Sequence, residues 1–165
     1  MPALNTGTLA PDFALPTTDG NMFALAEALQ RGPVLVAFFK VSCPICQYTL
    51  PYLERLYQAY KNRGVTLVAV SQNDRKDTVA FMKEYGITFP VLLDDTKTYP
   101  VSNAYGLTNV PTLFWIAPDG AIEVSSVGWA RKDIEDINHR MAEAAAVRKA
   151  PLFQPGEQVA DFRAG

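Results

Sequence analysis

The segment that decides the fold is VLVAFFKVSCPIC, residues 34–46. Its first six residues are apolar and rich in Val and Phe, which is typical of a central parallel strand that is covered on both faces. The segment ends in Cys43-Pro44-Ile45-Cys46, which contains the only two cysteines of the chain. A C-x-x-C pair between a strand and a helix favours either reversible disulfide chemistry or half of a metal site.

A zinc site within one chain is poorly supported by the sequence. Four-coordinate zinc needs two ligands besides Cys43 and Cys46, and His139 is the only histidine. His139 lies among polar residues of a predicted helix, so we expect it at the surface. We therefore expect no metal and no cofactor. Two chains that share zinc through paired C-x-x-C motifs remain an alternative.

The composition favours a single compact domain without a strongly charged surface. The chain has 165 residues, of which 48% are hydrophobic and 19% charged, enough for one well-buried core. Its net charge of -2 is too close to zero to indicate electrostatic binding to nucleic acid or to an acidic membrane. We expect neither as a partner.

The amino terminus favours a cytoplasmic location. It has neither the basic start nor the apolar run of a secretory signal, and no segment of the chain reaches membrane-spanning length. In a reducing compartment an ordinary cysteine pair would stay open. Transient oxidation during turnover therefore fits this pair better than a structural disulfide.

The periodicity of the chain predicts an α/β fold with a mixed sheet flanked by helices. Strands are expected at residues 33–39, 65–70, 91–93, 112–116 and 121–127. Helices are expected at residues 25–30, 43–62, 77–85 and 133–147. Residues 11–16 and 22–24 predict a small amino-terminal β-hairpin. We expect residues 1–147 to form the domain and residues 148–165 to form a tail that packs on it, because the tail retains large apolar residues.

The reacting sulfur is expected to be that of Cys43. A free thiol with a pKa of about 8.5 is only slightly ionised at neutral pH, so the nucleophile needs help. A helix start supplies N–H groups and the positive end of the helix dipole, and Pro44 suits the first helical position. Lys40 is the candidate cation, although a lysine that simply ends the strand in solvent is the plainer interpretation. Cys46, one turn further on, is expected to act as the resolving thiol.

Two separated motifs make the chain resemble the thioredoxin-like superfamily. The C-x-x-C pair at a strand-to-helix turn is followed by Asn109-Val110-Pro111-Thr112, which opens a later strand. The Ala10-Pro11-Asp12-Phe13 segment and the long interval between the two motifs are more similar to the TlpA and redoxin (AhpC/TSA-like) branch than to a minimal thioredoxin. The resemblance covers about residues 7–147 and implies a thioredoxin-like fold.

The resemblance also implies a substrate site and an activity. The peptide bond between Val110 and Pro111 is expected to be cis and to face the cysteines. The backbone beside Pro111 would pair with an extended segment of the substrate, and Gly128 matches a glycine that leaves room for this partner. The implied activity is that of a thiol-disulfide oxidoreductase with an antioxidant role. Its partners would be a disulfide-containing protein and an upstream thiol reductant.

Three positions depart from the pattern of the family. Ala37 stands where thioredoxins usually carry a buried acid, and Ser42 replaces the tryptophan that commonly precedes the first cysteine. Thr49 takes a position that is often glutamate in TlpA-like proteins. Proton transfer to and from Cys46 would then use water, Thr49 or a residue distant in sequence.

The sequence leaves other functions open beside the reduction of protein disulfides. A peroxiredoxin-like peroxidase would oxidise Cys43 to a sulfenic acid that Cys46 resolves, although Lys40 and Val36 stand where peroxiredoxins typically have Thr and Pro. A non-catalytic binding module would keep the fold and use it to hold a partner. Oxidation of a substrate would use the same two cysteines as its reduction.

Overall fold

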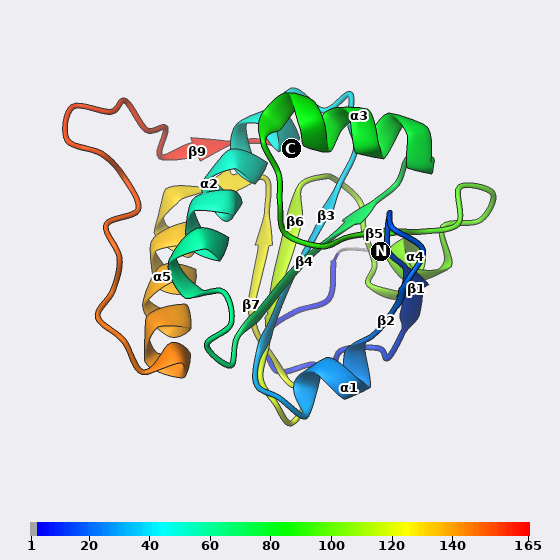
Figure 1. The fold of residues 1–165 in the computed structure, drawn as a ribbon, viewed down its shortest axis with the longest axis horizontal. Helices are drawn as coiled ribbons and strands as arrows, with labels where there is room; N and C mark the ends of the chain where they lie inside the picture. Colours follow the sequence, from blue (N-terminus) through cyan, green and yellow to red (C-terminus); the bar gives the residue numbers. More distant parts are fainter. Residues whose placement is uncertain (1–2) are drawn as a thin grey trace.

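A five-stranded mixed sheet forms the centre of the structure, a computed structural model that describes residues 3–165 (Figure 1). Its strands, in order across the sheet, are β5 (Val91–Leu93), β4 (Thr66–Ser71), β3 (Val34–Phe39), β6 (Thr112–Ile116) and β7 (Ile122–Val127). β3, β4 and β5 run parallel, whereas β6 is antiparallel to both β3 and β7. The predicted mixed sheet is therefore confirmed.

β3 is the most enclosed strand of this sheet. It pairs with β4 on one edge and with β6 on the other, and all six of its side chains are fully buried. Successive side chains point to opposite faces, so Phe39 belongs to one apolar cluster and Phe38 to another. An uninterrupted apolar run is what such a position requires.

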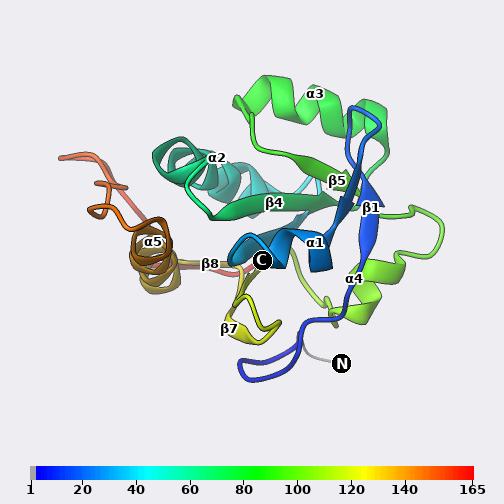
Figure 2. The ribbon, with the colours of Figure 1, turned by 60° about the horizontal axis from the view of Figure 1, so that its bottom comes forward.

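The helices cover both faces of the sheet. Those that contribute to the cluster around Phe39 are α2 (Pro44–Tyr60), α3 (Arg75–Tyr85) and α5 (Arg131–Ala145). Those that contribute to the cluster around Phe38 are α1 (Leu25–Leu29) and α4 (Pro100–Ala104). In Figure 2, α2 and α3 lie above β4 and α1 lies below it. None of the helices in residues 3–165 is long and apolar enough to cross a membrane.

Two small two-stranded sheets complete the fold. β1 (Ala14–Pro16) pairs antiparallel with β2 (Met22–Ala24), which confirms the predicted amino-terminal hairpin. β8 (Trp129–Ala130) pairs antiparallel with β9 (Phe162–Arg163), which lies in the tail. This second pair was not predicted from the sequence.

α4 was also absent from the sequence prediction, and hydrogen bonds from its first turn to the preceding loop explain its position. The buried Asp94 carboxylate accepts hydrogen bonds from the backbone N–H groups of Val101 at 3.3 Å and Ser102 at 2.8 Å. These are N-terminal N–H groups that a five-residue helix cannot satisfy internally. A helix of this length shows no hydrophobic period that the sequence would reveal.

The tail begins at a buried hydrogen-bond network between α2 and α5. The Tyr60 hydroxyl donates to Asn138 Oδ1 at 2.5 Å and accepts from the backbone N–H of Ala150 at 2.8 Å. Asn138 Nδ2 donates in turn to the carbonyl of Ala150 at 2.9 Å. Both polar groups of one tail residue are therefore paired with side chains of the domain.

The middle of the tail is held by an apolar contact and an ion pair. Leu152 is buried in the cluster that α2 and α5 share. The Arg55 guanidinium binds both carboxylate oxygens of Glu157, at 2.8 and 2.7 Å, and also donates to the carbonyl of Leu152. The hydrogen bonds from Arg55 lower the pKa of Glu157 to about 2. Residues 148–165 thus lie on the domain, while their separation from a domain of residues 1–147 stays a prediction.

The network around Tyr60 predicts a measurable loss of stability in Tyr60→Phe. The change leaves the N–H of Ala150 and one oxygen of Asn138 without this partner inside the protein, which costs about 1–3 kcal/mol. The free energy of unfolding, measured by urea denaturation, should fall by this amount. Tyr57→Phe removes a hydroxyl from the same helix and should change it by less than about 0.5 kcal/mol. Equal losses in the two variants would contradict the role of the network.

Candidate active site

The two cysteines lie at the start of α2, just beyond the end of β3. Cys43 has an extended backbone, with φ of -84° and ψ of 115°, and caps the helix, while Pro44 is the first helical residue. The backbone N–H of Cys46 donates to Cys43 Sγ at 3.1 Å. The helix therefore directs one of its N-terminal N–H groups at this sulfur, an arrangement that favours negative charge on it.

The two sulfurs differ in their access to solvent. Cys43 is partly exposed, whereas Cys46 has no exposed surface. Burial, followed by the hydrogen bond with Cys43, raises the pKa of the Cys46 thiol well above its ordinary value. Cys46 is therefore held as a neutral thiol, and Cys43 is the sulfur that a partner can reach.

The Val110-Pro111 loop lies directly against Cys43. Its peptide bond is cis, as the resemblance implied. The Cys43 thiol donates to the carbonyl oxygen of Val110 at 3.5 Å, and the Gly128 N–H donates to the carbonyl of Pro111 at 2.8 Å. The structure thus brings residues from three separate parts of the sequence, Cys43, Val110-Pro111 and Gly128, to one end of the sheet. The substrate-binding roles of Val110, Pro111 and Gly128 stay predictions.

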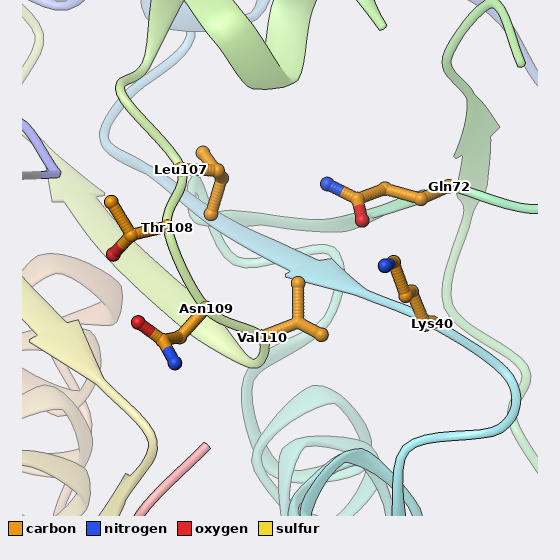
Figure 3. A pocket seen from close by; sticks show the side chains of 6 residues that line it. All are labelled: Lys40, Gln72, Leu107, Thr108, Asn109 and Val110. Atoms are coloured by element: carbon orange, nitrogen blue, oxygen red, sulfur yellow. The ribbon is translucent and has the colours of Figure 1, made fainter. Parts of the chain in front are cut away.

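A small cavity lies beside Val110, on the side of Lys40 (Figure 3). Its volume is about 170 Å³, and its lining comprises Lys40, Gln72 and residues 107–110. In Figure 3, Lys40 and Gln72 lie on one side and the loop of residues 107–110 on the other. The Lys40 side chain is exposed, and its charge acts weakly to lower the pKa of Cys46. Its role in tuning Cys43 stays a prediction, as does that of Pro44.

Among residues 3–165, no Asp or Glu side chain hydrogen-bonds to Cys46. Thr49 is fully buried, but its hydroxyl donates to the carbonyl of Ile45 at 2.7 Å, within its own helix. Ala37 pairs with Ala69 on β4 and with Leu113 on β6, so its surroundings in the sheet are apolar. A role of Thr49 in proton transfer stays a prediction, and water or a residue distant in sequence are the other candidates.

An aromatic contact between the site and the tail was not predicted from the sequence. Trp129 is fully buried and packs edge to face on Tyr48, with their rings 4.9 Å apart. The Trp129 indole N–H donates to the carbonyl of Ala160 at 2.6 Å, and the Arg163 guanidinium lies 5.1 Å from the Tyr48 ring centre. The apolar residues of the tail indicated packing, but no sequence pattern showed where the tail would lie.

The structure offers no cluster of metal ligands in its described part. Among residues 3–165, no group of three or more His, Cys, Asp or Glu side chains lies close enough together to hold a metal ion. His139 lies at the surface, as predicted, 3.1 Å from Glu143. Zinc shared between two chains stays a hypothesis.

Comparisons with known proteins agree with this geometry. The chain is 31% identical over 156 residues to the thiol-disulfide oxidoreductase ResA of Bacillus subtilis (strain 168), covering 94% of this chain and 79% of ResA. It is 28% identical to a crystal structure from Chlorobium tepidum named as a thiol:disulfide interchange protein DsbE, with a TM-score of 0.75 over 87% of this chain and 99% of that one. A solution structure from Bacteroides thetaiotaomicron, 21% identical with a TM-score of 0.80 over 88% of this chain and 95% of that one, shares the fold.

The fold, the cysteine pair and these relatives define the class of protein. The chain is a thiol-disulfide oxidoreductase with a thioredoxin-like fold. Residues 6–125 match the family model of the AhpC/TSA family, and the chain belongs to that family.

The raised pKa of Cys46 predicts a loss of stability at alkaline pH. The unfolded chain ionises this thiol near its ordinary pKa of 9.0, whereas the folded protein keeps it protonated. The stabilisation is therefore complete below that pH and is lost above it. Between about pH 8 and about pH 10, the free energy of unfolding of the reduced protein should fall by about 1.4 kcal/mol more than that of Cys46→Ala.

Urea denaturation in the presence of a thiol reductant measures this difference. Cys46→Ala is the matched control, because it retains every other group that titrates in the same range. If the two proteins lose stability in parallel as the pH rises, the enclosed state of the Cys46 thiol is contradicted.

Proposed function

We propose that this oxidoreductase reduces the disulfides of proteins by dithiol exchange through Cys43 and Cys46. The observation that carries the proposal is the pairing of one accessible and one enclosed sulfur at a helix start. The N–H of Cys46 supports the sulfur of Cys43, while the sulfur of Cys46 is closed to solvent. A partner disulfide therefore meets Cys43 first.

The exchange takes place in two steps. The Cys43 thiolate attacks one sulfur of the partner disulfide, a Cys43–partner bond forms, and the other partner sulfur leaves as a thiolate. Cys46 then loses its proton and attacks the sulfur of Cys43, which releases the second partner thiolate. The partner has gained two electrons and the enzyme has formed a Cys43–Cys46 disulfide. An upstream thiol reductant opens this bond for the next cycle.

The loop at Val110 is the proposed docking site for the partner. The Val110 carbonyl oxygen lies 3.5 Å from Cys43 Sγ, so a segment that pairs with this backbone lies close to the reacting sulfur. Pairing of an extended segment with exposed backbone is a common way to bind proteins of varied sequence. This supports a protein, rather than a small molecule, as the substrate.

Substitution of each cysteine by serine separates the two roles. With insulin as the disulfide substrate and dithiothreitol as the reductant, Cys43→Ser should reduce turnover to the rate without enzyme, because no nucleophile remains. Cys46→Ser should also stop turnover but accumulate a mixed disulfide with the substrate, visible by mass spectrometry of the intact complex. If Cys46→Ser traps nothing while Cys43→Ser does, the assigned roles are reversed.

The same preparation distinguishes the alternative functions. Rapid consumption of hydrogen peroxide that depends on Cys43, without insulin reduction, would favour the peroxidase. Partner binding that survives both serine substitutions, without turnover, would favour the binding module. A reduction potential near about -270 mV would support reduction of substrates, and a much more oxidising value would support disulfide formation.

We also propose a cytoplasmic location and an antioxidant role, in which the protein restores thiols on oxidised proteins. The proposal is supported by the absence of any cysteine outside the reactive pair, since proteins of oxidising compartments commonly carry structural disulfides. Fractionation of cells that produce the protein should recover it with cytosolic markers. Recovery with membrane or secreted markers would reject this location.

A further inference from the structure

The carboxyl-terminal tail reaches the candidate active site. After α5 it runs along the outer side of that helix and returns to the end of the sheet as β9 (Figure 1). There β9 pairs antiparallel with β8, with Trp129 opposite Arg163. The N–H of Arg131 donates to the carbonyl of Asp161 at 2.9 Å, which extends the contact beyond the strand pair.

The tail fills the space beside Gly128. A Cβ atom at Gly128 would lie 2.6 Å from the carbonyl oxygen of Arg163 and 3.0 Å from the nitrogen of Gly165. Both distances are shorter than an ordinary van der Waals contact, and φ of Gly128 is +78°, a conformation that favours glycine. The room that the resemblance assigned to a bound partner is therefore taken by the backbone of residues 163–165.

The tail also contacts the loop that faces Cys43. Asn109 Nδ2 donates to the carbonyl of Gly165 at 3.1 Å. A Cβ atom at Gly165 would lie 2.5 Å from the carbonyl oxygen of Val110, the same oxygen that accepts a hydrogen bond from the Cys43 thiol. Gly165 is thus packed against the atom next to the reacting sulfur.

We propose that residues 162–165 occupy the substrate groove from within the chain, and that a protein disulfide must displace them to reach Cys43. The proposal rests on the proposed function. An extended partner segment beside Val110 needs the space against the Val110 carbonyl and Gly128 that residues 163–165 fill, and the two cannot occupy it together. Because the tail is tethered, it competes at a high local concentration. The apparent affinity for the partner falls in proportion to the fraction of molecules whose groove is open.

Residues 162–165 are held in a way that allows them to leave the groove. Phe162–Arg163 forms a strand of only two residues, both exposed. The tail just before them is anchored more firmly, because Ala160 accepts from the Trp129 indole and its own N–H donates to the Tyr48 hydroxyl at 3.1 Å. Residues 162–165 can therefore open beyond Asp161 while the rest of the tail stays in place.

This arrangement affects large and small disulfides differently. Cys43 remains partly exposed with the tail in place, so a small disulfide that needs only the sulfur can react without opening the groove. A peptide disulfide that pairs with the loop at Val110 must first displace the tail. The tail therefore makes the enzyme selective against substrates that bind weakly through their backbone.

The test compares two disulfides in a single reaction of Cys43, with Cys46→Ser as the background. One disulfide is a peptide whose cysteine is joined to thionitrobenzoate, and the other is the symmetric thionitrobenzoate disulfide. In each case the Cys43 thiolate forms a new disulfide and thionitrobenzoate leaves as a coloured thiolate. The reaction is stoichiometric and does not require turnover.

Three further changes are made in this background. One chain ends after Asp161, which retains the contact with Arg131. In the second, Gly165→Val keeps residues 162–165 but places a side chain against the Val110 oxygen. The control is Ala164→Val, which adds bulk at the neighbouring exposed residue. Thermal unfolding confirms that each chain is folded.

We expect the rate constant for the peptide to rise several-fold in the shortened chain and in Gly165→Val, and about tenfold if the groove is covered nine-tenths of the time. The peptide rate constant of Ala164→Val should stay within about twofold of that of the Cys46→Ser background. The rate constant for the small disulfide should stay within the same range in every chain. Unchanged or lower peptide rates in the shortened chain and Gly165→Val would overturn the proposal. An equal rise for both disulfides would also overturn it, because the tail would then only screen the sulfur.

Insulin turnover by the unaltered chain is measured separately, so the two proposals fail in different ways. Peptide rates that depend on the tail, without insulin turnover, would reject the reductase and retain the tail as an occupant of a peptide groove. Insulin turnover with peptide rates that do not depend on the tail would retain the reductase and reject the occupant.

Discussion

β3 lies between β4 and β6 with none of its side chains exposed, and this burial determines where the chemistry occurs. A shift of one residue along its neighbours would move every side chain of the strand to the opposite apolar cluster and disrupt the packing on both faces. Its end therefore has a fixed position, and the chain passes within a few residues into α2. Cys43 is the residue at which the helix begins. The rest of the site, including the Val110 loop and the tail, is arranged around that point.

The start of α2 gives two cysteines of the same motif different chemistry. Cys43 has an extended backbone outside the helix, where its sulfur receives an N–H group and remains accessible. Cys46 is one turn inside the helix, on the face that packs into the core, and burial raises the pKa of its thiol. In the proposed cycle, the order of attack and resolution follows from this difference in solvation rather than from the residue types.

Some of the structure could be predicted from particular residues and some could not. The VLVAFF run predicted β3, and the cysteine and proline motifs together predicted the fold and the cis bond at Pro111. α4 was not predicted, because five residues are too few for a helical period to appear and the helix is held by the nearby buried carboxylate of Asp94. The β8–β9 pair was not predicted either, because two residues on each side are too few for a period to appear. The roles of Lys40 and Thr49 stay predictions.

The sequence by itself determined the α/β class and the reactive pair, because hydrophobic period and motif spacing are local properties of the chain. Only the tertiary structure decided what surrounds that pair. Gly128 and Gly165 are separated along the chain, and nothing in either segment shows that the tail fits between the loop at Val110 and β8. Their contact depends on how α5 and the tail fold back over α2, and such long-range packing is set by the shapes of the surfaces that meet.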